Sequence, residues 1–342
     1  MEKTIDYVFP YVDCDDPQWI EEYNKYAPKK RNENKWGTDM QRFRSNDLLK
    51  YTFRSIEKNM PFIRKVHLIV MSDSQVPEWI NRDTVDIIYH KDYIPEKFLP
   101  TFNSNTIESF LARVPGLSDK FIYGNDDLFI TSKCSETDFF SGDIPKYTMK
   151  KREYIPTAPG DRLRYDDKKL VTGKDDKMVY EVQHICMPYV METIKEVYEA
   201  NKKEIVDSIG KFREPGQYNQ WIYSIHQGLN KKHINKGIRY LSTEINPAHR
   251  GKYAVDWKKY KAICLNDSCE TTQSDLRYVR EKLDKMFPKP CKYEKAEKKK
   301  VVKPVKKIAK VVKPVEKKEK KPINLKTGRP DSRGWNEFFG MQ

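Results

Sequence analysis

Two acidic clusters in this 342-residue chain have the residue types that metal or phosphate chemistry needs. Asp126 and Asp127 are adjacent and lie between apolar runs at residues 121–123 and 128–130. Burying two neighbouring carboxylates is costly unless they bind a cation or belong to a hydrogen-bonded network. Residues 13–16 read Asp-Cys-Asp-Asp, and clustered hard oxygens of this kind suit Mg²⁺ or Mn²⁺. The pattern favours function for the Asp126–Asp127 pair, whereas residues 13–16, taken alone, are more typical of an ordinary loop.

Four later polar residues are ambiguous when each is considered alone. His184 has the usual features of a capping or core histidine, and Arg213 those of a surface arginine. Asn266 and Asp267 follow an apolar run and are typical of a turn. None of the four predicts a function by itself, and only their order along the chain gives them weight.

Several enzyme classes are excluded by missing motifs. The chain contains only 14 glycines and has no G-x-G-x-x-G or G-x-x-x-x-G-K-[ST] loop to cradle a phosphate. It also lacks a G-x-S-x-G elbow and an H-E-x-x-H motif. A dinucleotide dehydrogenase and a P-loop enzyme are therefore disfavoured.

The elements that must position these residues alternate between strands and helices. Apolar patterns predict strands at 5–9, 65–71, 85–89 and 121–123, with helices at 45–58 and 104–113. This alternation implies right-handed crossovers and an α/β, Rossmann-like, mostly parallel sheet with flanking helices. Polar residues gather where the strands end, which is where ligands bind in open α/β sheets. We therefore expect a crevice of the nucleotide-binding type at that edge.

The second half of the chain is predicted to be mainly helical. Helices are expected at 187–209, 217–229 and 275–286, while residues 135–180 have no clear pattern. No apolar run approaches the ~18–20 residues of a membrane span, and the N-terminus does not resemble a signal peptide. A cytoplasmic protein is the expectation.

The positive charge is concentrated at the C-terminal end. The formal net charge is +15, and residues 292–342 hold 17 Lys and Arg against 6 Asp and Glu. Residues 296–342 form a basic low-complexity tail with a repeated Val-Val-Lys-Pro-Val and a short aromatic end. Such a segment buries too little apolar surface to offset its ordering entropy, so we expect a disordered, Lys-rich tail.

The six cysteines are thinly spread, which favours reduced thiols over a disulfide framework. Cys264 and Cys269 form one close pair with no second pair nearby. Because a structural zinc site needs four convergent ligands, this pair does not predict one.

The order of these motifs resembles the Stealth family, which includes capsular polysaccharide phosphotransferases and an N-acetylglucosamine-1-phosphotransferase. The resemblance rests on LPTFNSN followed by IE, on FIYGNDD, and on four regions in the family's order. These regions make up a transferase domain at 1–295 and lie at residues 5–19, 42–130, 184–215 and 264–295. Tyr11, Cys14 and Gly124 depart from the family pattern, and the first two leave the identity of the donor open.

The resemblance implies transfer of a sugar 1-phosphate from a nucleotide-sugar donor, UDP-linked in expectation, to a hydroxyl of a glycan or lipid-linked glycan acceptor. A phosphodiester forms, as in capsular or exopolysaccharide synthesis. Mg²⁺ or Mn²⁺ is expected as cofactor because clustered carboxylates can hold the ion against a diphosphate. The expected metal ligands are Asp126, Asp127, Asn266 and Asp267.

The resemblance also assigns roles to the remaining candidates. His184 and Arg213 join Asp126 and Asp127 as catalytic residues, with Arg213 gripping phosphate oxygens. His184 has the intrinsic pKa of a general base near ~6.5, although an aspartate is an alternative base. The expected substrate-binding residues are Asp13, Asp16, Arg42, Arg44, Asn103, Asn105 and Glu108.

Two other functions are consistent with the sequence. A conventional metal-dependent glycosyltransferase would share the crevice and its carboxylates but would release a nucleoside diphosphate. A basic protein that binds nucleic acid or membrane is supported only by the tail, and we expect no specific nucleic acid partner. The tail instead suggests contact with an anionic membrane surface, at the inner face of the cytoplasmic membrane.

Overall fold

The first strand, β1 (Ile5–Pro10), lies at the centre of a five-stranded sheet in the computed structural model, which describes residues 4–28, 35–158 and 160–296. The strand order is β10-β4-β1-β2-β3. The other strands are β2 (Ile63–Val70), β3 (Val85–Tyr89), β4 (Lys120–Tyr123) and β10 (Met187–Val190). Only β10 pairs antiparallel, so the predicted mostly parallel α/β sheet is confirmed.

A second sheet contains β5 (Leu128–Ile130), the strand that follows β4 in the chain. It has the order β12-β13-β5, with β12 (Tyr240–Glu244) and β13 (Ala262–Asn266). β12 and β13 are parallel, whereas β5 runs antiparallel to β13. The short turn between β4 and β5 therefore links the two sheets, and it carries Asp126 and Asp127.

The segment without a clear pattern in the sequence contains short strands and two helices. β6 (Phe140–Ser141), β7 (Ile144–Tyr147) and β11 (Ile234–Asn235) form one small sheet, and β8 (Met149–Glu153) pairs with β9 (Met178–Val182) in another. β6, β7 and β11 are two to four residues long, and β8 reads Met-Lys-Lys-Arg-Glu, so hydrophobic periodicity did not reveal them.

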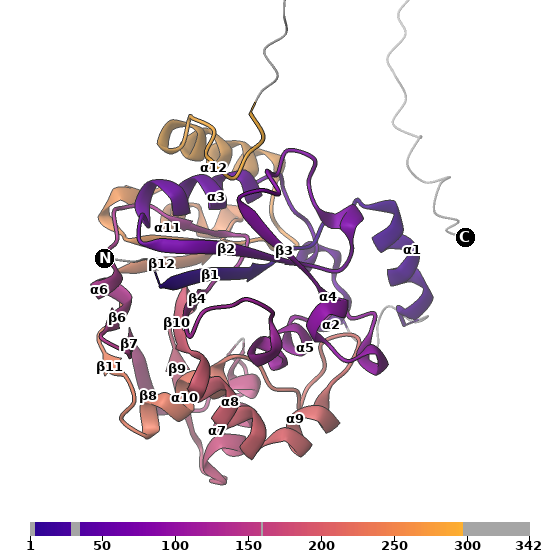
Figure 1. The fold of residues 1–342 in the computed structure, drawn as a ribbon, viewed down its shortest axis with the longest axis vertical. Helices are drawn as coiled ribbons and strands as arrows, with labels where there is room; N and C mark the ends of the chain where they lie inside the picture. Colours follow the sequence, from indigo (N-terminus) through magenta and orange to yellow (C-terminus); the bar gives the residue numbers. More distant parts are fainter. Residues whose placement is uncertain (1–3, 29–34, 159, 297–342) are drawn as a thin grey trace, which may run out of the picture. The chain divides into compact units, whose positions relative to one another are not determined.

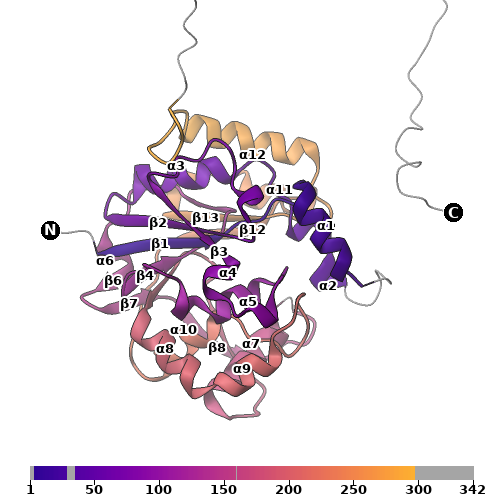
Figure 2. The ribbon, with the colours of Figure 1, turned by 45° about the vertical axis from the view of Figure 1, so that its right-hand side comes forward.

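Helices cover the main sheet on both sides (Figures 1 and 2), with α3 and α12 on one side and α7 to α10 on the other. The long helices are α1 (Pro17–Tyr26), α3 (Leu49–Asn59), α7 (Asp161–Thr172), α8 (Met191–Ala200), α9 (Lys202–Ser208), α10 (Trp221–Leu229) and α12 (Gln273–Met286). The short ones are α2 (Lys35–Thr38), α4 (His90–Tyr93), α5 (Ser104–Ser109), α6 (Glu136–Phe139) and α11 (Arg250–Tyr253). Single 3₁₀ turns occur at Met40–Arg42, Asp73–Gln75, Glu96–Phe98, Leu111–Arg113, Pro247–His249 and Trp257–Lys259.

The predicted helix at 187–209 is wrong in its first turn. Residues 187–190 form the edge strand β10, and α8 and α9 follow, separated at Asn201. Pro188 has no N–H to donate, which an edge strand tolerates. The other predicted helices exist with shifted ends: α3 begins at Leu49, α10 at Trp221, and α5 ends at Ser109 before a 3₁₀ turn.

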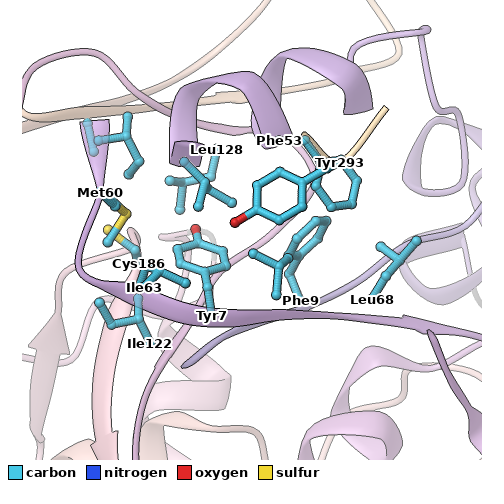
Figure 3. Packing of buried hydrophobic residues seen from close by; sticks show 14 of the residues in the cluster. Tyr7, Phe9, Phe53, Met60, Ile63, Leu68, Ile122, Leu128, Cys186 and Tyr293 are labelled. Atoms are coloured by element: carbon cyan, nitrogen blue, oxygen red, sulfur yellow. The ribbon is translucent and has the colours of Figure 1, made fainter. Parts of the chain in front are cut away.

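The main core packs β1 and β2 against α3 (Figure 3), with Tyr7, Phe9 and Phe53 fully buried. The rings of Phe9 and Phe53 meet edge to face at 5.4 Å. Burying each such ring contributes roughly 1.5–3 kcal/mol, so this face fixes α3 over the sheet. A Cβ at Gly124 would overlap the hydroxyl of Tyr7, which explains why this chain has glycine there.

The helix α3 also holds the turn that carries the acidic pair. The Thr52 hydroxyl donates to the backbone carbonyl of Asp126 at 2.6 Å. The Ser55 hydroxyl accepts from the backbone N–H of Ile130 at 3.0 Å. Both hydroxyl-bearing residues are buried, so the apolar packing of α3 sets the position of the β4–β5 turn.

Within the described ranges, no helix is both long and apolar enough to span a bilayer. The tail predicted at 296–342 lies, apart from Ala296, outside the described residues.

Candidate active site

A cavity of about 680 Å³ lies at the carboxyl ends of the main strands. Its walls come from the residues after β1, the β4–β5 turn, the start of α5 and the end of β13. Ten of the predicted site residues line it: Arg42, Arg44, Asn105, Glu108, Asp126, Asp127, His184, Arg213, Asn266 and Asp267. Residues more than 200 positions apart in sequence thus meet in one cavity.

Asp126 and Asp127 are half-buried on the cavity wall. Burial raises the pKa of both carboxyls, and the charge of Asp127 raises the pKa of Asp126 further. Neither carboxylate forms an ion pair with a basic side chain of the described residues. An electrostatically unbalanced pair of this kind is suited to a divalent cation.

The donor set fits Mg²⁺ or Mn²⁺ only if the substrate completes it. Among the described residues, no group of three or more His, Cys, Asp and Glu side chains converges on one point. Mg²⁺ is commonly held by one or two carboxylates together with substrate phosphates and water, and Asp126 and Asp127 supply that part. Asn266 lines the same cavity, and its Oδ1 lies 3.6 Å from the Cys264 sulfur.

Asp267 and Arg44 are engaged with each other instead of with separate ligands. Nε of Arg44 lies 2.7 Å from Oδ2 of Asp267, and Nη2 lies 2.8 Å from Oδ1. Asn46 donates to Oδ2 at 2.9 Å, and the backbone N–H of Ser268 donates to Oδ1 at 2.8 Å. Because both oxygens of Asp267 are occupied, this arrangement does not leave it as a metal ligand.

His184 lies between β9 and β10 and lines the cavity. Burial, together with the charges of Arg164 and Arg213, lowers its pKa to about 4. The imidazole is therefore neutral at pH 7, which is the protonation state that a general base needs. Its Nδ1 lies 3.7 Å from the sulfur of Cys264.

Arg213 and Arg42 place positive charge in the same cavity. The Arg213 guanidinium donates to the hydroxyl of Ser104, the first residue of α5. Burial lowers the pKa of both arginines, and the charge of Arg213 lowers that of Arg42 further, to about 10. Two arginines that line one cavity favour an anionic ligand in it.

Asn103 does not line the cavity but holds the loop that carries Arg213. Its Nδ2 donates to the carbonyls of Gly210 and Phe212 at 3.0 and 3.1 Å and to Oε1 of Gln217 at 2.8 Å. Its Oδ1 accepts from the backbone N–H of Asn105 at 3.0 Å and thereby caps α5. The geometry gives Asn103 a supporting role in place of the predicted substrate contact.

Glu108 lines the cavity with its carboxylate tied to the protein. Oε1 accepts from the Tyr123 hydroxyl at 3.0 Å, and Oε2 accepts from the backbone N–H of Gln220 at 3.1 Å. Burial raises the pKa of Glu108, and the charge of Arg213 opposes this. Its charge therefore balances part of the positive charge of Arg213.

Asp13 and Asp16 lie outside the cavity lining and organise the loop after β1. Asp16 caps α1 by accepting from the backbone N–H of Gln18 at 3.1 Å, and it also accepts from Gln75 at 2.7 Å. Gln75 in turn accepts from the backbone N–H of Asp13 at 2.8 Å. These bonds fix the start of α1, which brings Trp19 to the cavity.

Sequence reasoning missed the aromatic wall of the cavity. Trp19, Phe43 and Phe102 line it, with the Trp19 ring 5.0 Å from Phe43 and 5.5 Å from Phe102. The three residues come from separate segments, so no local pattern could have grouped them. Trp221 was missed as well, and it meets the ring of His184 edge to face at 6.4 Å.

Comparison with known proteins identifies two relatives that align along almost their whole length and a third that aligns over a shorter segment. The capsular polysaccharide phosphotransferase WcwK of Streptococcus pneumoniae is 29% identical over 86% of this chain and all of its own. The receptor polysaccharide phosphotransferase WefC of Streptococcus oralis is 27% identical over 85% of this chain and 99% of its own. A capsular polysaccharide phosphotransferase of Actinobacillus suis is 38% identical over 42% of this chain and 39% of its own.

Among solved structures, the galactosyltransferase LgtC with donor and acceptor sugar analogues aligns over 83% of this chain and 95% of its own, at 12% identity and a TM-score of 0.39. Residues 42–147 match the family described as Stealth protein CR2, conserved region 2. This match contains the predicted second region at 42–130, and the full-length relatives extend the similarity to both sides of it. Residues 42–147 thus carry the second conserved region of the Stealth family, the family that the sequence motifs resemble.

Proposed function

We propose that the protein transfers a sugar 1-phosphate from a nucleotide-sugar, UDP-linked in our expectation, to a hydroxyl of a glycan or lipid-linked glycan in capsular or exopolysaccharide synthesis. The proposal rests on one observation above all. A single cavity contains an acidic pair without a basic partner among the described residues, two arginines and a neutral imidazole. The full-length relatives of the chain are named polysaccharide phosphotransferases.

The reaction joins the acceptor oxygen to the phosphorus that bears the sugar. The bond from that phosphorus to the oxygen of the nucleoside monophosphate breaks, and the monophosphate leaves with the bonding electrons. Phosphoryl transfer of this kind needs positioning and neutralisation of oxygen charge more than covalent help from the protein. The acidic pair and the two arginines supply different parts of that requirement.

Arg213 and Arg42 bind the non-bridging phosphate oxygens in this mechanism, because a guanidinium can donate to two oxygens at once. Ser104 and Asn103 hold Arg213 in place, directly and through its loop. Asp126 and Asp127 would hold Mg²⁺ or Mn²⁺, which supplies charge neutralisation at the diphosphate when bound.

His184 accepts the proton of the attacking hydroxyl. Its lowered pKa keeps the ring unprotonated at neutral pH, and its place on the cavity wall puts it within reach of an acceptor. Trp221, packed edge to face against the ring, restricts its orientation.

Product analysis tests the proposal. The full-length protein is incubated with a panel of nucleotide-sugars, a polysaccharide acceptor and Mg²⁺, and the released nucleotide is identified by chromatography. We expect a nucleoside monophosphate, and a His184→Ala variant that releases it about 10²-fold more slowly. Release of a nucleoside diphosphate would show a conventional glycosyltransferase and contradict the proposal.

We further propose that the basic tail attaches the enzyme to anionic lipid at the inner face of the cytoplasmic membrane. Residues 292–326 hold 15 Lys against 4 Glu, and clusters of 4–8 basic residues suffice for measurable attachment. Such attachment would keep the enzyme near a lipid-linked acceptor.

A further inference from the structure

Cys264 occupies a central position beneath the cavity that the mechanism above does not use. It lies in β13, its side chain is fully buried, and its sulfur contacts the Ser242 hydroxyl and three polar groups of the cavity. The sulfur is 3.6 Å from Oδ1 of Asp127, 3.6 Å from Oδ1 of Asn266 and 3.7 Å from Nδ1 of His184. These separations are hydrogen-bond distances for the larger sulfur atom, so the thiol connects the acidic pair to the imidazole.

Counting protons restricts how this cluster can be arranged. A thiol has one proton to donate and a sulfur that can accept. The Oδ1 atoms of Asp127 and Asn266 can only accept from it, and a carboxylate is a stronger acceptor than a neutral imidazole nitrogen. With the thiol proton directed to Asp127, the sulfur is left to accept from the Ser242 hydroxyl and from His184, and the contact with His184 is a hydrogen bond only if Nδ1 carries the proton.

We propose that Cys264 is a positioning residue that holds His184 in the tautomer protonated at Nδ1, so that Nε2 is the basic nitrogen. The proposal rests on the proposed function for the role of His184 as general base. The tautomer of a histidine is set by the bond that its other ring nitrogen makes, and in this site the partner in that bond is a thiol.

Packing alone is the competing explanation for a buried cysteine in a strand, since free cysteine often behaves as a small apolar residue. Two substitutions separate the explanations. Cys264→Val fills the site with apolar atoms but removes the hydrogen bonds, whereas Cys264→Ser keeps a donor and acceptor and is smaller. Cys264→Ala serves in place of the valine variant if that variant does not fold.

Cys186 offers a matched control. It is a fully buried thiol of the same core, and it makes no hydrogen bond to His184 or Asp127 among the described residues. Cys186→Val therefore tests the effect of changing a buried thiol without touching the proposed connection.

The tautomer can be measured directly, whether or not the protein is active. Two-bond ¹H–¹⁵N spectra of full-length protein labelled in its six histidines report the protonated nitrogen of each ring, and a His184→Gln variant identifies the signal of His184. We expect a protonated Nδ1 in the unmodified protein and in Cys186→Val. A mixture of tautomers is expected in Cys264→Val. A protonated Nε2 in the unmodified protein, or no change in Cys264→Val, would overturn the proposal.

Kinetics provide the second test. Removing a group that orients a catalytic ligand typically costs 10–100-fold, so Cys264→Val should lower kcat about 10-fold or more with the KM for the donor unchanged. Cys264→Ser should recover most of that loss. A valine variant as active as Cys186→Val, or a serine variant no better than valine, would show that only packing matters. If no nucleoside monophosphate is ever released, the proposed function fails, while the tautomer measurement still decides the role of Cys264.

Discussion

The Arg44 guanidinium pairs with both carboxylate oxygens of Asp267 across 223 residues of sequence. The pair joins the segment that follows the 3₁₀ turn at Met40–Arg42 to the end of β13. Asp267 is mostly buried and Arg44 about one-third exposed, so the pair is shielded from water on one side only. The pair holds two walls of the cavity together, and both side chains line it.

Breaking this pair should weaken substrate binding because the two cavity walls would no longer be held together. We expect Arg44→Ala and Asp267→Ala each to raise the KM for the nucleotide-sugar several-fold, and the double variant to be no worse than either single one. Such non-additivity is expected when two residues act only through each other. Independent, multiplying effects in steady-state kinetics would show that one of them contacts the substrate directly.

The acidic pair should make activity depend on a divalent cation. Asp126→Asn and Asp127→Asn are each expected to lower turnover by orders of magnitude. They should not lower the Tm of the metal-free protein at neutral pH, because burial and mutual repulsion already disfavour the two charges. Turnover and thermal unfolding, with and without Mg²⁺, check both statements. Full activity of the unmodified protein in excess chelator would contradict the expectation.

Local patterns predicted much of the sheet because the strands are continuous apolar runs, which are typical of parallel strands covered on both sides. β3 has its predicted bounds, and β1 and β4 are each one residue longer than predicted, at Pro10 and at Lys120. β10 was missed because Met187-Pro188-Tyr189-Val190 merges with the apolar periodicity of α8, and only its pairing with β4 identifies it.

For the site, the sequence predicts which residue types are present but not which ones meet. It brought out the Asp126–Asp127 pair because adjacent carboxylates inside apolar runs are rare. It could not show that Asp267 faces Arg44, nor that Asn103 faces Gly210 and Phe212, because these contacts join distant segments. Which distant residues contact each other is decided by the tertiary fold.

Activity should require the guanidinium group of Arg213 and not only its positive charge. Arg213→Ala is expected to cost ~10²-fold or more in kcat/KM, and Arg213→Lys should be nearly as poor because an ammonium cannot donate to two oxygens in a fixed fork. Steady-state kinetics with a saturating acceptor measure both. A lysine variant with a near-normal rate would reduce Arg213 to a general positive charge.

The acid stability of the fold should depend on Asp6, at the opposite end of the sheet. Burial alone would raise the pKa of Asp6, but hydrogen bonds from Arg64 and His67 outweigh it and lower the pKa to about 2. A lowered folded-state pKa stabilises the protein above the unfolded value near ~3.9 and loses that effect as pH falls toward about 2. Denaturant unfolding from pH 7 to pH 3 should show Asp6→Asn less stable by about 2 kcal/mol at pH 7 and a smaller gap at pH 3. A gap that does not change with pH would contradict this.

The basic tail should bind anionic lipid in a salt-dependent way. Each Lys near an anionic surface contributes up to ~1 kcal/mol, and this attraction falls off within a Debye length of about 10 Å at 0.1 M salt. Full-length protein should co-sediment with vesicles that contain anionic lipid at low salt, and should be released at high salt. Neutral vesicles should retain little of it.

The matched control is a variant truncated after Lys295, which keeps every residue that lines the cavity. We expect it to lose vesicle binding and to keep its rate of monophosphate release with a water-soluble acceptor, because the tail serves only to bring the enzyme to the membrane. Equal sedimentation of the two proteins, or binding that ignores lipid charge and salt, would refute the attachment and leave the tail as a solubilising segment.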